Sequence, residues 1–67
     1  MPEYKLYCLD GRGRITRRHD FVATDDRTAA EQGNVLGNGS DCELWSGTRK
    51  VAMLPAGSEP VWMDRTA

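Results

Sequence analysis

The side chains that could act as nucleophile and base are few. The 67-residue chain holds two cysteines, Cys8 and Cys42, and one histidine, His19. A catalytic thiol needs a base within hydrogen-bond reach. In a hairpin that places Cys8 opposite Ile15, His19 falls four residues further along its strand, about 13 Å from the thiol at the usual rise per residue. We therefore expect no Cys–His dyad and interpret His19 as an exposed strand residue.

Asp25 and Asp26 are adjacent carboxylates that follow Thr24. Acid–base catalysis or metal binding by such a pair needs further ligands or a cleft. Oxygen acceptors immediately before a predicted helix instead bind the free N–H groups of its first turn and suit its positive end. The sequence thus favours a helix cap at this place and predicts no metal site.

The segment Gly11-Arg12-Gly13 has the glycines of a phosphate-binding loop. Such loops lead directly into the N-terminus of a helix. Here a strand pattern follows from Ile15 onwards, so we interpret the segment as a hairpin turn. Because the chain shows neither a partnered catalytic set nor a cofactor motif, we expect a protein that is not an enzyme and that uses no cofactor.

Basic residues are concentrated around one predicted strand, beside two tyrosines of the preceding strand. The set comprises Arg12, Arg14, Arg17, Arg18 and His19, with Lys5, Tyr4 and Tyr7 on the preceding strand. Arginines on a sheet can neutralise phosphates while rings stack unpaired bases. Two features argue against this use: the formal net charge is −1, and the aromatic motif of RNA-binding sheets is missing. Single-stranded nucleic-acid binding is therefore the alternative function.

An apolar triplet, Val61, Trp62 and Met63, follows a loop that contains Pro55 and Pro60. It can fold back onto the core, pack against a second copy, or stay mobile. Together with a strand edge that could pair, the triplet favours a small interaction module. Its partner would be another protein or a second copy of this chain in a homodimer.

The strongest structural signal is a β-hairpin in the second half of the chain. Gly47-Thr48 suits a type II′ turn, which needs glycine at its first central position. That turn places Leu44 opposite Val51 and Cys42 opposite Met53, so that four apolar side chains share one face. A lone hairpin is at best marginally stable, so the rest of the chain must cover this face.

A second hairpin and a helix supply that cover. Residues 4–9 and 14–22 read as strands joined by a turn, and the cap cluster predicts a helix from about Asp26 to Leu36. With strands near 42–46 and 49–54, the sequence predicts an α+β fold of pattern ββαββ. Two hairpins form one antiparallel sheet, and the helix packs on a face of it.

The predicted ββαββ pattern gives the boundaries of the domain and the residues of its core. The ββαββ domain spans residues 1–54, and residues 55–67 form a C-terminal tail that contains proline and glycine. The apolar alternation of the strands and the small residues of the helix select the side chains that we expect to be buried. They are Leu6, Cys8, Ile15, Ala29, Ala30, Leu36, Leu44, Val51 and Met53.

The composition fits one small domain with a modest core, because 39% of the residues are hydrophobic. The chain has no apolar run long enough to span a membrane, and its start lacks the apolar centre of a signal peptide. We therefore expect a cytoplasmic protein with no membrane partner. In a reducing compartment Cys8 and Cys42 would be reduced and would act as small buried hydrophobes.

Several short motifs together resemble a group of short bacterial proteins that have no assigned activity. They are Tyr-x-Leu-Tyr-x-Leu-Asp at 4–10, Gly-Arg-Ile at 13–15, Ala-x-Asp-Asp at 23–26 and Cys-Glu-Leu-Trp-x-Gly at 42–47. The resemblance covers residues 3–54. It implies the same ββαββ architecture and adds no catalytic residue, cofactor or partner. The chain departs from the group in its helix, at residues 31–37.

Overall fold

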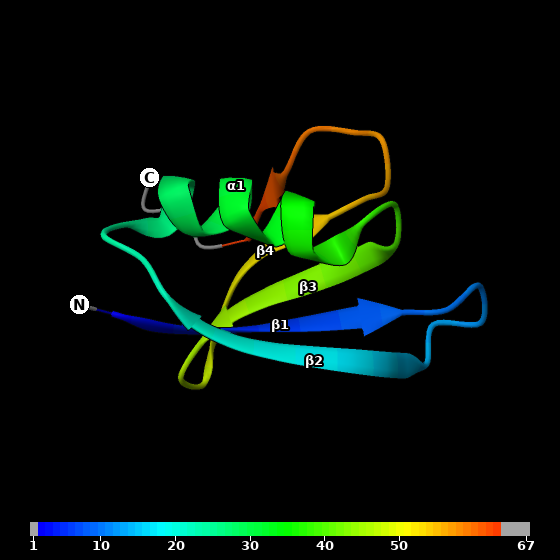
Figure 1. The fold of residues 1–67 in the computed structure, drawn as a ribbon, viewed down its shortest axis with the longest axis horizontal. Coiled ribbons are helices and arrows are strands. Elements are labelled where there is room, and N and C mark those ends of the chain that lie inside the picture. Colours follow the sequence, from blue (N-terminus) through cyan, green and yellow to red (C-terminus); the bar gives the residue numbers. More distant parts are fainter. Residues whose placement is uncertain (1, 64–67) are drawn as a thin grey trace.

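The computed structural model describes residues 2–63, which form one helix and a five-stranded sheet. Neighbouring strands are all antiparallel, and their order across the sheet is β2-β1-β3-β4-β5. The helix lies over one face of this sheet (Figure 1). The elements are β1 (Glu3–Leu9), β2 (Ile15–Val22), α1 (Asp26–Gly37), β3 (Asp41–Ser46), β4 (Arg49–Leu54) and β5 (Val61–Trp62).

The predicted α+β class and the two hairpins are confirmed, but the predicted strand count of four is too low. After Leu54 the chain turns back, and β5 pairs with β4 along the edge of the sheet. The N–H group of Met63 also donates to the carbonyl of Val51, at 2.9 Å. Of the three alternatives for the apolar triplet, the structure therefore shows the fold-back.

Capping groups define both ends of α1. Asp25 is the N-cap residue, and its side chain accepts a hydrogen bond from the N–H group of Thr28 at 2.8 Å. Asn38 ends the helix in the left-handed conformation, with φ of 48°. The cap interpretation is thereby confirmed for Asp25, whereas Asp26 is the first residue of the helix and its carboxylate accepts from Tyr4 instead. The helix begins at the predicted residue and ends one residue later than predicted.

The hairpin of β3 and β4 keeps its predicted turn but not its predicted register. Gly47 has a positive φ of 63°, as a type II′ turn requires. Val51 is an extra, unpaired residue of β4, a bulge opposite the step from Leu44 to Trp45, and it places Leu44 opposite Ala52. The expected Leu44–Val51 pair is therefore wrong by one residue, and Cys42 likewise lies opposite Leu54 rather than Met53. One extra residue in a strand turns every later side chain to the other face.

The core lies between α1 and the sheet. Nine side chains were predicted to be buried, and the prediction is wrong for Ile15, which is 55% exposed on the edge strand β2. Met53 is only partly buried because the bulge turns it away from the helix, and Leu36 packs at the margin of the core. The observed core consists of Tyr4, Leu6, Cys8, Ala23, Ala29, Ala30, Cys42, Leu44, Val51, Ala52 and Leu54.

A polar contact joins the helix to the sheet beside this core. The hydroxyl of Tyr4 donates to Asp26 Oδ1 at 2.7 Å, and Arg49 forms an ion pair with the same carboxylate at 3.3 Å. The Tyr4 hydrogen bond, followed by that of Arg49, lowers the pKa of Asp26. Burial, and then the Asp26 carboxylate, raise the pKa of Tyr4 to about 12. No helix of the described residues is long and apolar enough to cross a membrane.

Leu44 gives the first test of this core, because its side chain is fully buried. We expect Leu44→Ala to lower the free energy of unfolding by about 2–5 kcal/mol, through lost burial and the cavity left behind. Ile15→Ala, at the exposed position that the sequence assigned to the core, should change it by less than about 0.5 kcal/mol. Urea unfolding monitored by circular dichroism measures both values, and equal losses for the two variants would contradict this core.

The Tyr4–Asp26 contact predicts how stability depends on pH. Because the pKa of Asp26 is lowered in the folded protein, its carboxylate stabilises the fold at every pH above its ordinary pKa of 3.8. This stabilisation is lost as the pH falls through the lowered pKa. Because the pKa of Tyr4 is raised, its protonated hydroxyl stabilises the fold below its ordinary pKa of 10.0, and this stabilisation is lost as the pH rises towards 12. When urea unfolding is measured over a range of pH, Tyr4→Phe should remove the loss of stability at alkaline pH and weaken the loss of stability at acid pH. Tyr7→Phe on the other face of β1 is the control, and identical pH profiles for both variants would refute the prediction.

Candidate functional site: the open face of the sheet

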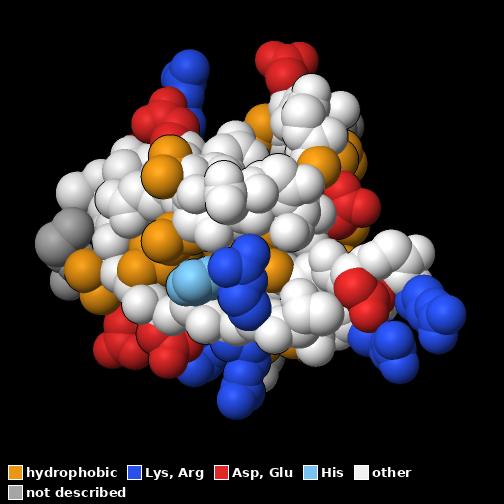
Figure 2. Space-filling model, turned by 45° about the vertical axis from the view of Figure 1, so that its right-hand side comes forward, with side chains coloured by type: hydrophobic (Ala, Val, Ile, Leu, Met, Phe, Trp, Pro, Cys, Tyr) orange, Lys and Arg blue, Asp and Glu red, His pale blue; other side chains and the backbone are white. Residues whose placement is uncertain are grey.

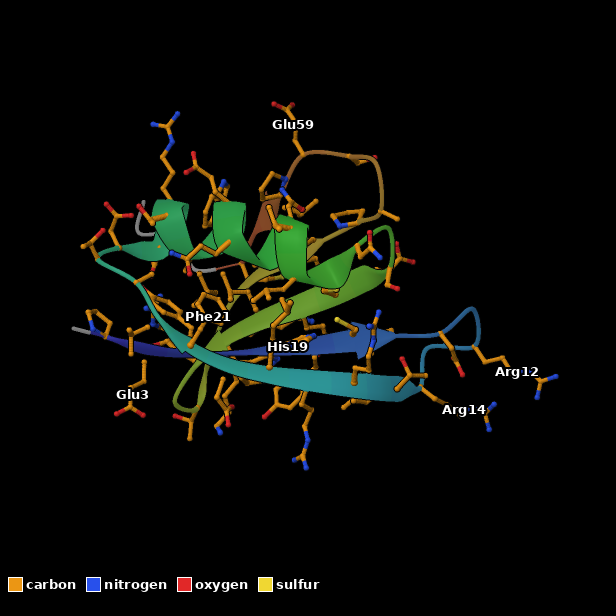
Figure 3. All side chains as sticks on the ribbon, in the orientation of Figure 1. Glu3, Arg12, Arg14, His19, Phe21 and Glu59 are labelled. Atoms are coloured by element: carbon orange, nitrogen blue, oxygen red, sulfur yellow. The ribbon has the colours of Figure 1, made fainter. Side chains whose placement is uncertain are left out.

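The two faces of the sheet differ in what covers them. Tyr4, Leu6 and Cys8 of β1 point to the inner face, which α1 covers, so the alternate residues of β1 point to the opposite, outer face. Figure 3 shows Glu3 directed away from the helix and Phe21 and His19 directed towards it. By the same alternation and pairing, the outer face carries Lys5, Tyr7, Leu9, Arg18, Asp20, Glu43, Trp45, Lys50, Met53 and Val61.

Two aromatic rings form the centre of the outer face. The rings of Tyr7 and Trp45 meet edge to face, with their centroids 6.5 Å apart. Trp45 Nε1 donates to Glu43 at 3.2 Å, and Lys50 forms an ion pair with Glu43 at 3.4 Å. These contacts hold the indole in one orientation. Rigid aromatic rings of this kind contribute strongly to protein interfaces, because little entropy is lost when they are buried.

Charges of both signs surround these rings in near balance. Lys5 and Asp20 lie directly opposite each other and form an ion pair at 3.1 Å. Arg18 and Lys50 add positive charge, while Glu43 and the outward-facing Asp41 add negative charge. A surface that binds the phosphates of nucleic acid is instead predominantly basic. The balance on the outer face therefore fits a protein surface better.

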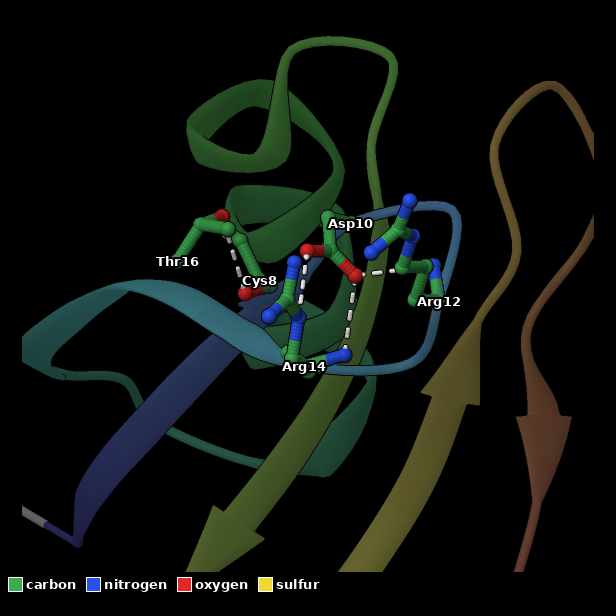
Figure 4. A network of polar contacts seen from close by, with 5 residues as sticks. All are labelled: Cys8, Asp10, Arg12, Arg14 and Thr16. Carbon is green, nitrogen blue, oxygen red and sulfur yellow. Dashed lines mark hydrogen bonds and ion pairs between the residues drawn. The ribbon is translucent and has the colours of Figure 1, made fainter.

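The predicted basic set is divided by the structure. Arg12 and Arg14 lie in the loop between β1 and β2, where both backbone N–H groups donate to Asp10 (Figure 4). These hydrogen bonds lower the pKa of Asp10. Arg17 lies opposite Cys8 on the inner side of β2, whereas Arg18 lies opposite Tyr7 on the outer face. Of the four arginines, only Arg18 is therefore brought together with Tyr7 as the sequence suggested.

The imidazole of His19 faces the inner side of the sheet. It lies opposite Leu6, it is partly buried, and Figure 2 shows it, in pale blue, among hydrophobic side chains. The expectation of an exposed histidine is therefore wrong. Cys8 pairs with Arg17 on β2, two residues before His19, and its sulfur contacts Cys42 at 3.1 Å. Within residues 2–63 no group of three or more His, Cys, Asp or Glu side chains could hold a metal ion.

The apolar triplet of the tail is also divided. Val61 lies opposite Met53 and so extends the outer face, and half of its surface is exposed. Trp62 lies opposite Ala52 on the inner side. There it lines a groove of about 400 Å³ with Ala30 and Asn34 of α1. Met63, which follows β5, is 42% exposed.

Sequence reasoning missed Trp45, the central residue of the outer face. The alternation of side chains along the strand could have identified it. Because Cys42 and Leu44 were assigned to one face, the residues between and after them, Glu43 and Trp45, must share the other face. A tryptophan on the face away from the helix is covered only in part by its own chain, and Trp45 is indeed only partly buried.

No protein-family model matches the chain, and no solved structure matches it. Among curated proteins the chain is similar to the phenylalanine–tRNA ligase beta subunit of Leifsonia xyli subsp. xyli (strain CTCB07). The two are 37% identical over 62 residues, which make up 92% of this chain and 7% of that protein. The chain thus spans about 7% of the length of this relative.

Proposed function

We propose that this protein is a small, non-enzymatic interaction module that forms a homodimer through the outer face of its sheet. The observation that carries the proposal is the aromatic pair Tyr7 and Trp45 at the centre of an uncovered sheet face. Val61 and Met53 extend the apolar surface towards the edge strand β5. A chain of this size covers one face of its sheet with its single helix, and a second copy can cover the other.

The charges of the outer face suit a partner with the same surface. A twofold interface brings identical patches together, so the patch must be complementary to itself. The near balance of Lys5, Arg18 and Lys50 against Asp20, Glu43 and other acids meets this condition. In the described part of the chain Arg18 has no ion-pair partner, so it is available to a carboxylate of the second copy.

The size of the face predicts a reversible dimer. The molecule measures 30 × 25 × 20 Å. No face of a molecule of this size is larger than about 30 by 25 Å, or about 750 Å² in projection. Specific interfaces bury about 800 Å² per partner, and weak ones about 600 Å² or less. We therefore expect a weak dimer that dissociates on dilution.

The edge of β2 is a weaker candidate for self-association. It is the only long edge strand among residues 2–63, because β5 has two residues. Its central residues are Arg17, Arg18, His19 and Asp20, and charged side chains of this kind oppose pairing between strand edges.

Analytical ultracentrifugation over a range of concentrations tests the homodimer. Trp45→Glu places a charge at the centre of the outer face and should weaken the dimer at least about tenfold, because a buried unpaired charge is strongly unfavourable. Val35→Glu is the matched control, since Val35 on α1 is 79% exposed, and it should leave the dimer unchanged. Melting curves of the two variants show whether each stays folded.

The results separate the possible interfaces. A wild-type protein that stays monomeric at several hundred micromolar would refute the homodimer, and a dimer that Trp45→Glu leaves intact would move the interface away from the outer face. Repeating the experiment with a chain that ends at Leu54 tests the part that Val61 plays, and we expect a weaker dimer without it.

Single-stranded nucleic-acid binding remains the second candidate, because Arg18 lies opposite Tyr7, whose ring meets that of Trp45. The name of the relative, a tRNA ligase subunit, is consistent with it. In a titration of a labelled oligonucleotide at low salt, this candidate predicts that Arg18→Gln lowers both the affinity and its salt dependence. Arg27→Gln on α1 is the control. The absence of binding at high micromolar protein would end this second candidate.

A further inference from the structure

The two cysteines lie directly opposite each other in the sheet. Cys8 of β1 and Cys42 of β3 are partners in the antiparallel ladder, and both side chains are fully buried on the inner face. Their sulfur atoms are 3.1 Å apart, and both thiols are free. The sequence places these residues 34 positions apart and gives no sign of this contact.

The backbone at this pair already has the separation that a disulfide needs. Residues directly opposite in an antiparallel ladder have Cα atoms about 4.5–5.5 Å apart. Disulfide-bonded cysteines have Cα atoms about 4.4–6.8 Å apart and a sulfur–sulfur bond of about 2.05 Å. The sulfurs must therefore move about 1 Å closer, which small side-chain rotations can supply without separating the strands.

We propose that Cys8 and Cys42 form a reversible cross-strand disulfide inside the core when the protein meets a small-molecule disulfide such as oxidised glutathione. The thiolate of one cysteine attacks a glutathione sulfur, which forms a mixed disulfide and releases one glutathione thiolate. The thiolate of the other cysteine then attacks the protein sulfur of the mixed disulfide and releases the second glutathione. The released thiolates take up the two cysteine protons, so the pair is oxidised and one small-molecule disulfide is reduced.

The surroundings of the pair control access to it. The end of α1 closes over Cys42, because a Cβ atom at Gly37 would lie only 2.6 Å from Cys42 Sγ. Burial, and then the contact with Cys8, raise the pKa of Cys42 to about 12. The Cys42 thiol is thus protonated, and both thiols are covered in the native state. Oxidation then proceeds through local opening at the end of α1, or during folding, and is slow in the closed protein.

The bond would change the stability of the whole domain. It links β1 to β3 across the 33 positions that hold β2 and α1, so it restricts the unfolded chain strongly. From the chain-entropy relation, a loop of this length should raise the melting temperature of a small domain by about 10 °C or more. Reduction would return the protein to its less stable form.

The test uses the full chain in mixtures of oxidised and reduced glutathione. Free thiols are counted under denaturing conditions, the covalent state is read by mass spectrometry and non-reducing electrophoresis, and melting curves are recorded. We expect the loss of both thiols within one chain, no bound glutathione at equilibrium, and the raised melting temperature. The single variants Cys8→Ser and Cys42→Ser cannot form the bond and should show no such rise.

A second experiment shows whether burial of the thiols alone prevents their oxidation. The protein is unfolded in urea and refolded in oxidised glutathione, which exposes both thiols before the core closes. Thiols that remain free, or that carry only glutathione after refolding, would overturn the proposal. A disulfide between two chains, or an internal disulfide that lowers the melting temperature, would overturn it as well.

Discussion

The structure depends on how closely α1 approaches the sheet. The helix faces the strands with Ala29, Ala30, Gly33 and Gly37, all of them small and buried. A Cβ atom at Gly33 would lie 2.7 Å from Leu54 Cδ1, so a larger residue at this point would push the Leu54 side chain aside. The large buried side chains, such as Leu6 and Leu44, therefore come from the strands. A glycine within a helix lowers helix stability by about 1 kcal/mol relative to alanine, so α1 depends on this packing.

This arrangement also explains the open face. One helix of 12 residues covers the inner side of β1, β3 and β4, and the chain supplies no second layer among its described residues. The outer face consequently keeps the Tyr7 and Trp45 rings at the surface, held by Glu43 and Lys50. The same close packing buries the Cys8–Cys42 pair under the end of α1. One constraint thus produces both the proposed interface and the proposed disulfide.

The sequence predicted the local structure well because local signals dominate there. The cap residue Asp25 and the turn glycine Gly47 place the start of α1 and the turn of the second hairpin to the residue. The bulge at Val51 could not be predicted, because both Val51 and Ala52 are apolar and either register buries apolar side chains. Local sequence patterns also do not determine the order of the strands across the sheet. The contact between Cys8 and Cys42, the division of the arginines and the pairing of β5 all depend on that order.

The central claim is that the outer face is covered by a second copy of the chain. An isotope-filtered nuclear Overhauser experiment on a mixture of labelled and unlabelled protein tests it most directly, because it detects only contacts between chains. The account predicts contacts from the Tyr7 and Trp45 rings to the outer-face residues of the partner, among them Met53 and Val61. Contacts between chains that arise only from β2 or α1, or none at millimolar protein, would contradict it.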